Sequence, residues 1–162
     1  MTDAPRRLLP EEVGALAALA RIVWQATYPA LISQAQIDAM LADRYAAARI
    51  RSQLDDARHA WWVTGSPPAG FAHVYVDATA AKLDKLYVHP GRQRQGLGTA
   101  LLHACADWAR AQRCLVLRLQ VNRGNIPAIR AYESYGFHLV ESRVFDIGNG
   151  HVMDDHVMEI TL

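Results

Sequence analysis

The stretch HPGRQRQGLGTALL, from His89 to Leu102, decides the fold, because it sets glycines and basic side chains directly before an apolar run with helical spacing. A helix N-terminus exposes unpaired N–H groups and a partial positive charge, and glycines let a ligand approach the backbone closely. Such a junction can seat a phosphate or pyrophosphate. Arg92, Arg94 and the amides of Gln93 and Gln95 can add donors. Taken alone, the loop leaves open a second interpretation, in which the glycines only turn the chain and the arginines are solvated.

The spacing of the loop disfavours two common phosphate sites. A Walker loop needs Gly-Lys-Ser/Thr at its end, whereas Gly98 is followed by Thr99 and the loop holds no lysine. A dinucleotide fingerprint needs a third small residue where Leu101 stands. It also needs an acidic residue at the end of the next strand, where Asn122 stands.

The flanking segments alternate in type and place the loop in a strand-loop-helix-strand unit. Residues 96–112 carry apolar side chains at helical spacing, and residues 114–121 form a mostly apolar strand, as expected for a central one. Further elements are expected in the rest of the chain: an edge strand at 6–9, helices at 10–28, after Ser33 and at 45–54, strands beginning at 59, 70 and 81, and a closing hairpin after Phe137.

Composition points to one folded domain over residues 1–162. The chain has 17 Lys+Arg against 16 Asp+Glu, a net charge of +1, and 51% hydrophobic residues. This balance shows no excess of basic residues of the kind that binds nucleic acid or a membrane surface. We find neither a long uninterrupted apolar run nor the pattern of a signal peptide, so a cytoplasmic protein is expected. Cys105 and Cys114 have no metal-ligand spacing.

With its preceding residue, the quoted stretch resembles the acetyl-CoA pyrophosphate loop of the GNAT superfamily of N-acetyltransferases. The pattern there is Gln/Arg-x-x-Gly-x-Gly/Ala after a strand ending Val-x-Pro, and it is matched here by Gln93, Gly96 and Gly98 after Val88 and Pro90.

A second family motif, Asn-x-x-Ala-x-x-x-Tyr-x-x-x-Gly-Phe, is matched by VNRGNIPAIRAYESYGF at Asn125, Ala128, Tyr132, Gly136 and Phe137. In physical terms, Asn125 can cap a short helix and Gly136 can end it.

The resemblance implies a GNAT-type α/β fold, with a mixed central sheet of about six to seven strands and helices on both faces. It implies direct attack of an amine on acetyl-CoA, the co-substrate, with no metal. Tyr132 takes the general-acid position, and the Val88 main chain is expected to hold the oxyanion. The expected cofactor-binding residues are Leu86, Tyr87, Val88, Gln93, Arg94, Gln95, Gly96, Gly98, Thr99 and Asn125.

The general base is left open by the residues themselves. If Leu83, Lys85 and Tyr87 share one face of their strand, Asp84 shares the other with Leu86 and Val88 and can point toward the acetyl group. Equally, Asp84 can pair with Lys85 or with a neighbouring strand. His73, Asn122 and a water chain are weaker alternatives.

The acceptor is expected to be a primary amine of a small molecule or peptide, with Tyr28 as a candidate contact. The segment WQATYPALIS, Trp24 to Ser33, and the MDDHVM ending look like small GNAT enzymes near the polyamine acetyltransferases. Acidic groups such as Asp146, Asp154 and Asp155 would suit a polyamine.

Alternatives from other classes remain. One is an acyl-CoA-binding regulatory domain without turnover, and another is a nucleotide triphosphate binder. A homodimer is possible. His151, Asp154, Asp155 and His156 could suggest a metal site, but their alternation with apolar residues favours the closing strand of a hairpin.

Overall fold

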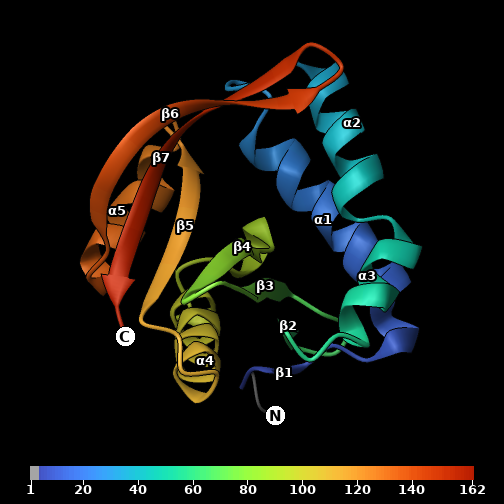
Figure 1. The fold of residues 1–162 in the computed structure, drawn as a ribbon. Helices are drawn as coiled ribbons and strands as arrows, with labels where there is room; N and C mark the ends of the chain where they lie inside the picture. The colour runs from blue at the N-terminus through green and yellow to red at the C-terminus, as the bar shows by residue number, and fades with distance from the viewer. Residues whose placement is uncertain (1–3) are drawn as a thin grey trace.

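The computed structural model describes residues 4–162 and forms a seven-stranded sheet with helices on both faces (Figure 1). This is the predicted mixed α/β architecture. The elements in chain order are β1 (Arg6–Arg7), η1 (Pro10–Glu12), α1 (Val13–Thr27), α2 (Gln34–Arg44), α3 (Ala47–Leu54), β2 (His59–Thr64), β3 (Gly70–Asp77), β4 (Ala80–Val88), η2 (Pro90–Arg92), α4 (Leu97–Ala111), β5 (Val116–Asn122), α5 (Ile126–Tyr135), β6 (His138–Gly148) and β7 (His151–Thr161).

The sheet runs in the order β1-β2-β3-β4-β5-β7-β6, and its pairs are antiparallel except β4 with β5. The parallel pair is short, because it begins at Ala80 opposite Val116 and ends at Leu83 opposite Leu119. Beyond Leu83, β4 and β5 part. This divergence is the feature of the fold that positions the site.

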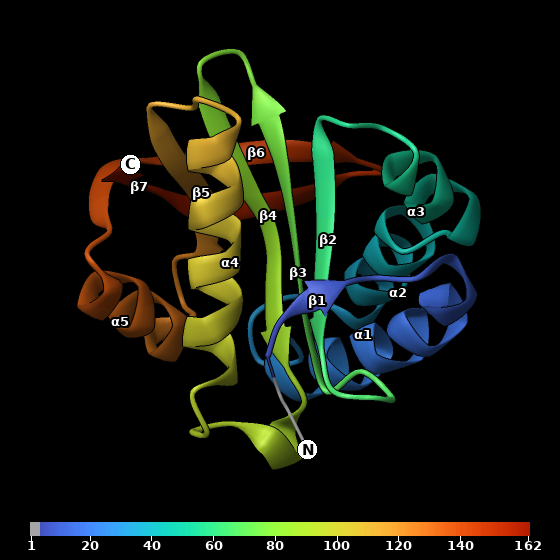
Figure 2. The same ribbon diagram turned by 90° about the horizontal axis from the view of Figure 1, so that it is seen from below.

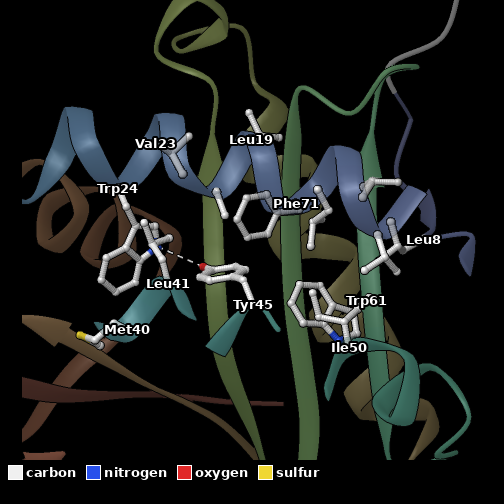
Figure 3. Close-up of a cluster of buried hydrophobic side chains, with 14 of the residues drawn as sticks. Leu8, Leu19, Val23, Trp24, Met40, Leu41, Tyr45, Ile50, Trp61 and Phe71 are labelled. Atoms are coloured by element: carbon white, nitrogen blue, oxygen red, sulfur yellow. Dashed lines mark hydrogen bonds between the residues drawn. The ribbon is translucent and has the colours of Figure 1, made fainter. Parts of the chain in front are cut away.

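Helices α1, α2 and α3 cover one face of the sheet and α4 and α5 cover the other (Figures 1 and 2). Figure 3 shows the core on the first face, where Trp24 of α1 donates a 3.0 Å hydrogen bond to the Tyr45 hydroxyl above Phe71 and Trp61 of the sheet. The core on the second face gathers the apolar side of α4 against β3, β4 and β5. The two faces therefore carry separate cores.

Local signals account for several boundaries. The Ser33 hydroxyl accepts a 3.1 Å hydrogen bond from the Gln36 N–H and starts α2, as expected. Gly136, with φ of 124°, ends α5. The expected Asn125 cap is wrong, because the Asn125 side chain makes no capping hydrogen bond with α5. Both cysteines are free and buried. No helix of residues 4–162 is long and apolar enough to cross a bilayer.

The hairpin of β6 and β7 curves away from the rest of the sheet and reaches α2 (Figure 1). It is attached there by Gln36, whose side-chain Nε2 donates a 2.7 Å hydrogen bond to the Val152 carbonyl. Residues from the hairpin thus meet residues of α2 and β4 on the α1–α3 face.

Candidate active site

A cavity of about 1070 Å³ lies where β4 and β5 part. It is lined by the end of β4, the loop before α4, the first turns of α4, the length of α5, part of β5, the end of α1 and the connection between α1 and α2. Its volume is at the upper end of the range for small-molecule and cofactor sites. We call it the larger cavity.

The loop between β4 and α4 presents its backbone to this cavity. Gly96 occupies the N-cap of α4 with φ of 80°, and no side chain caps the helix there. A Cβ on Gly96 would meet nothing within 4 Å, and one on Gly98 would meet only Val88 Cγ2 at 3.8 Å. The N–H groups of the first turn are therefore open to an anion, and the space that a side chain would fill is available to a ligand.

The structure brings the sequence-predicted residues together around this cavity, with one exception. Gln95 does not line it, because its carboxamide accepts a 2.9 Å hydrogen bond from Arg92 Nε. The predicted residues that do line it are Tyr28, Asp84, Leu86, Tyr87, Val88, Gln93, Arg94, Gly96, Gly98, Thr99, Asn125 and Tyr132.

Tyr132 lies on α5 and faces the larger cavity, with its ring edge-on to Phe137 at a centroid distance of 5.6 Å. Burial raises the pKa of its hydroxyl. A tyrosine with a raised pKa keeps its proton at neutral pH, so this hydroxyl is available as a donor.

A β-bulge in β4 decides where the Asp84 side chain points. His73 of β3 is opposite Lys85 and Val74 is opposite Leu83, so Asp84 is the extra residue. The bulge turns Asp84 and Lys85 to the α1–α3 face, whereas Leu83 and Leu86 pack in the core under α4. The expected arrangement, in which Asp84 shares a face with Leu86 and Val88, is wrong because simple alternation fails at this point.

Asp84 is held in a buried network on that face. Its carboxylate accepts hydrogen bonds from Lys85 Nζ and from His73 Nδ1, the latter at 3.1 Å. His73 Nε2 lies 2.9 Å from His59 Nδ1. The Lys85 ammonium, buried with its side chain, stands 5.1 Å from the centre of the Trp61 ring.

The charges in this network set its protonation. Burial favours a higher pKa for Asp84, but the charge of Lys85 and the hydrogen bond from His73 outweigh it and hold the pKa well below its ordinary value. Burial lowers the pKa of His73 to about 4, although Asp84 opposes this shift. At neutral pH the Asp84 carboxylate is therefore charged and the His73 imidazole is neutral, which makes both Asp84 and His73 weak proton acceptors.

A second cavity, of about 210 Å³, lies on the α1–α3 face beside this network. We call it the smaller cavity. It is bounded by α1, α2, β4, β5 and the hairpin of β6 and β7. The two cavities share Tyr28, Leu83, Asp84, Lys85, Tyr87 and Gln120. The Tyr28 hydroxyl lies 2.7 Å from that of Tyr87 at this shared wall.

Sequence reasoning did not single out Gln120 or Phe145 as lining residues, and it named Asp155 only together with other residues, among acidic groups that suit a polyamine and in a cluster that could suggest a metal site. Asp155 faces the smaller cavity, whereas its neighbour Asp154 is exposed and pairs with Arg123 at 3.0 Å. The sequence did contain a signal for Asp155. Met153, Asp155 and Val157 are alternate residues of one strand, so the carboxylate shares a strand face with two apolar side chains, and all three are buried in the structure. Among residues 4–162 no group of three or more His, Cys, Asp or Glu is placed to hold a metal ion.

Comparison with known proteins places this geometry in a family context. Residues 17–137 match the model of the acetyltransferase (GNAT) family. An uncharacterised N-acetyltransferase of Mycobacterium tuberculosis (strain ATCC 25618 / H37Rv) is 30% identical over 150 residues, which cover 88% of this chain and 93% of that protein.

Two further proteins are similar to this chain, one in sequence over part of its length and the other in fold. The ribosomal protein bS18-alanine N-acetyltransferase of Escherichia coli (strain K12) is 41% identical over 70 residues, or 43% of this chain, and the match spans about half of that enzyme (47%). The fold is similar to that of the PaiA N-acetyltransferase from Thermoplasma acidophilum in complex with coenzyme A, with a TM-score of 0.84, 24% identity and complete coverage of both chains.

Proposed function

The chain belongs to the GNAT acetyltransferase family, and on that premise we propose that it transfers the acetyl group of acetyl-CoA to a primary amine. The observation that carries the proposal is the larger cavity, which runs from the open backbone at Gly96 and Gly98 to the Tyr132 hydroxyl and adjoins a second, polar cavity. One cavity serves the cofactor and the other the acceptor, and one domain holds both.

The loop before α4 is the proposed seat of the cofactor's diphosphate. The N–H groups of the first turn of α4 supply donors and the positive end of the helix dipole. Arg94 and Gln93 line the same space and can add charge and a hydrogen bond. Since neither Gly96 nor Gly98 carries a Cβ, phosphate oxygens can reach the backbone there.

The acyl arm is proposed to lie along β4 beyond Leu83, where β5 no longer pairs. An extended chain can use the main-chain groups of Leu86 and Val88 as an added strand would. The Val88 N–H is the proposed donor to the oxyanion that forms as the amine attacks.

Tyr132 is the proposed general acid. When the neutral amine nitrogen bonds to the acetyl carbon and the C–S bond breaks, the departing thiolate takes the proton of the tyrosine hydroxyl. The nitrogen then loses one proton to water, and water returns a proton to the tyrosinate. Its place in the cavity wall and its raised pKa support this role, because the proton is still present at neutral pH. The amine comes from the side of the smaller cavity, past Tyr28.

The proposal is tested by thiol release from acetyl-CoA with polyamines, amino acids, aminoglycosides and N-terminal peptides as acceptors. We expect at least one amine to give amine-dependent release. Tyr132→Phe should lower kcat by about two orders of magnitude with little change in acetyl-CoA affinity. Tyr75→Phe is the matched control, since Tyr75 lines neither cavity, and it should behave as the parent protein.

Two results would contradict the proposal. Tight acetyl-CoA binding with no release for any amine would indicate a regulatory acyl-CoA-binding domain. Tight ATP binding that competes with coenzyme A would indicate a nucleotide site. An unchanged kcat and pH–rate profile in Tyr132→Phe would remove only the general-acid role.

A further inference from the structure

Asp155 of β7 is a buried carboxylate in the wall of the smaller cavity. It stands opposite Asn122 in the pairing of β5 with β7, close to the point where β5 has parted from β4. The residue is 4% exposed, and its Oδ1 has no hydrogen-bond partner among residues 4–162. A buried carboxylate oxygen without a donor is costly, so a fold that keeps one needs a reason.

The other carboxylates near this cavity have partners. Asp84 accepts from Lys85 and His73, and Asp146 accepts a 2.9 Å hydrogen bond from the Gly148 N–H. Asp155 therefore differs from both, because its buried Oδ1 receives no hydrogen bond from residues 4–162.

The nearby cations donate no hydrogen bond to Asp155 Oδ1. The charged groups that face the cavity are Arg44 from α2, Lys82, Asp84 and Lys85 from β4, and Asp146 from β6. Lys82 Nζ donates to Gln120 Oε1, and Lys85 Nζ donates to Asp84. Arg44 and Lys82 act on Asp155 only through space, without an ion pair among the described residues. A ligand with N–H donors and a positive charge would supply the hydrogen bond that Asp155 Oδ1 does not receive from the described residues.

We propose that Asp155 binds the ammonium group of the acceptor and so selects a cationic amine as the substrate. The inference deepens the proposed function and rests on it for the identity of the ligand as the acceptor. The location fits, because the smaller cavity shares Tyr28, Tyr87 and Gln120 with the larger one. An ammonium held by Asp155 lies on the acceptor side of the wall that faces Tyr132, and it loses one proton to water before its nitrogen attacks.

The first test observes the carboxylate directly in the full-length protein. The side-chain carboxyl of aspartate is labelled with ¹³C, and the Asp155 resonance is assigned by its loss in Asp155→Asn. Ethylammonium chloride is the probe, with sodium chloride at equal ionic strength as the reference. We expect ethylammonium, and not sodium, to shift the Asp155 resonance and to lower its titration midpoint, because a bound cation favours the ionised form. A resonance that ethylammonium leaves in place would overturn the proposal.

The second test is kinetic and uses the amine that the thiol-release panel selects. Asp155→Asn should raise KM for that amine at least about tenfold, as expected for losing a charge-assisted hydrogen bond, and leave KM for acetyl-CoA unchanged. Asp154→Asn removes the same charge from the adjacent, exposed residue and should match the parent protein. Unchanged KM for the amine, or a loss confined to kcat, would overturn the binding role.

The two tests separate this inference from the proposed function. If no amine of the panel is acetylated, the proposed function fails, and the ethylammonium titration still decides whether Asp155 binds an ammonium ion. If acetylation occurs and Asp155→Asn binds the amine normally, only the inference fails.

Discussion

Asp84 and Asp155 line the same cavity, yet their surroundings give them opposite properties. The ammonium of Lys85 and the His73 imidazole stabilise the Asp84 carboxylate, which lowers its pKa. Removing one partner of such a buried pair typically costs about 3–5 kcal/mol, because the other charge is left uncompensated. Among residues 4–162 no cation forms an ion pair with Asp155, and burial dominates its protonation. Asp84 is thus suited to holding the bulge of β4, and Asp155 to meeting a ligand.

The unsatisfied state of Asp155 predicts a stability gain when its charge is removed. Burial, helped by the charge of Asp154, raises the pKa of Asp155 to about 6 from its ordinary 3.8. The folded state therefore binds this proton more tightly than the unfolded state. Stability is lost as pH rises from about 4 to 6, and the loss persists at neutral pH. Asp155→Asn should then be more stable than the parent protein by about 3 kcal/mol at pH 7.5.

Urea unfolding at two pH values checks this prediction. The difference between Asp155→Asn and the parent should nearly vanish at about pH 3, where most of the parent carboxyl is protonated in both states. Asp154→Asn should show no comparable gain, because Asp154 is exposed and paired with Arg123. A parent protein that is as stable as Asp155→Asn at pH 7.5 would show that the carboxylate is already satisfied.

At the scale of single elements, the loop before α4 needs a glycine for its backbone conformation, and the same glycine leaves space for a ligand. Gly96 adopts a left-handed φ of 80° at the helix N-cap, and the space beside its Cα is open. Gly150, in the turn between β6 and β7, has a φ of 75° and equally open surroundings. The two glycines therefore have similar backbone conformations, but only Gly96 lies in the loop that lines the larger cavity.

Replacing Gly96 with valine should weaken binding of coenzyme A at least about tenfold, because the side chain occupies the approach to the first-turn N–H groups. Gly150→Val is the matched control, since it carries a similar strain of about 1–3 kcal/mol away from the loop. Titration calorimetry with coenzyme A and urea unfolding of both variants separate the two effects. Equal affinities in the two folded variants would count against the loop as the diphosphate seat.

Much of the element-level arrangement could be predicted from the sequence, because it is encoded locally. The loop glycines, the helical spacing after them, the Ser33 cap and the Gly136 stop are short-range signals, and each is present in the structure. The bulge at Asp84 left no such signal. It depends on the pairing of β4 with β3, and it reverses the faces that simple alternation assigns. The Asn125 cap failed because a residue type permits a cap without requiring it.

The smaller cavity shows what the sequence could not disclose. Asp155, Arg44, Lys82 and Phe145 come from four separate elements, and only the closing of the hairpin over the sheet brings them together. The acidic residues near the C-terminus were visible as a group, but which of them turns inward depends on the register between β5, β7 and β6. Long-range register therefore decides the lining of the smaller cavity, the proposed acceptor side, whereas a local motif decides the loop before α4, the proposed seat of the diphosphate.

At the scale of the whole molecule, the hairpin of β6 and β7 closes the smaller cavity by reaching across the sheet to α2 (Figure 1). The attachment includes two hydrogen bonds from Gln36 Nε2, a part-buried one to the Val152 carbonyl at 2.7 Å and a buried one to Met153 Sδ at 3.3 Å. Gln36 itself lines neither cavity. A change at Gln36 should therefore act on the acceptor only through the position of the hairpin.

Gln36→Met keeps the length of the side chain and removes its N–H donor, at an expected cost of about 1 kcal/mol. The hairpin should then open more often, which we expect to see as faster hydrogen exchange at the amides of residues 146–152. KM for the acceptor amine should rise a fewfold while KM for acetyl-CoA stays unchanged, because the loop before α4 lies away from the hairpin. Gln34→Met, at an exposed position of the same helix, is the control and should change neither. If Gln36→Met raised KM for the amine and KM for acetyl-CoA equally, the hairpin would be coupled to the larger cavity as well. The proposed separation of an acceptor cavity from a cofactor cavity would then be wrong.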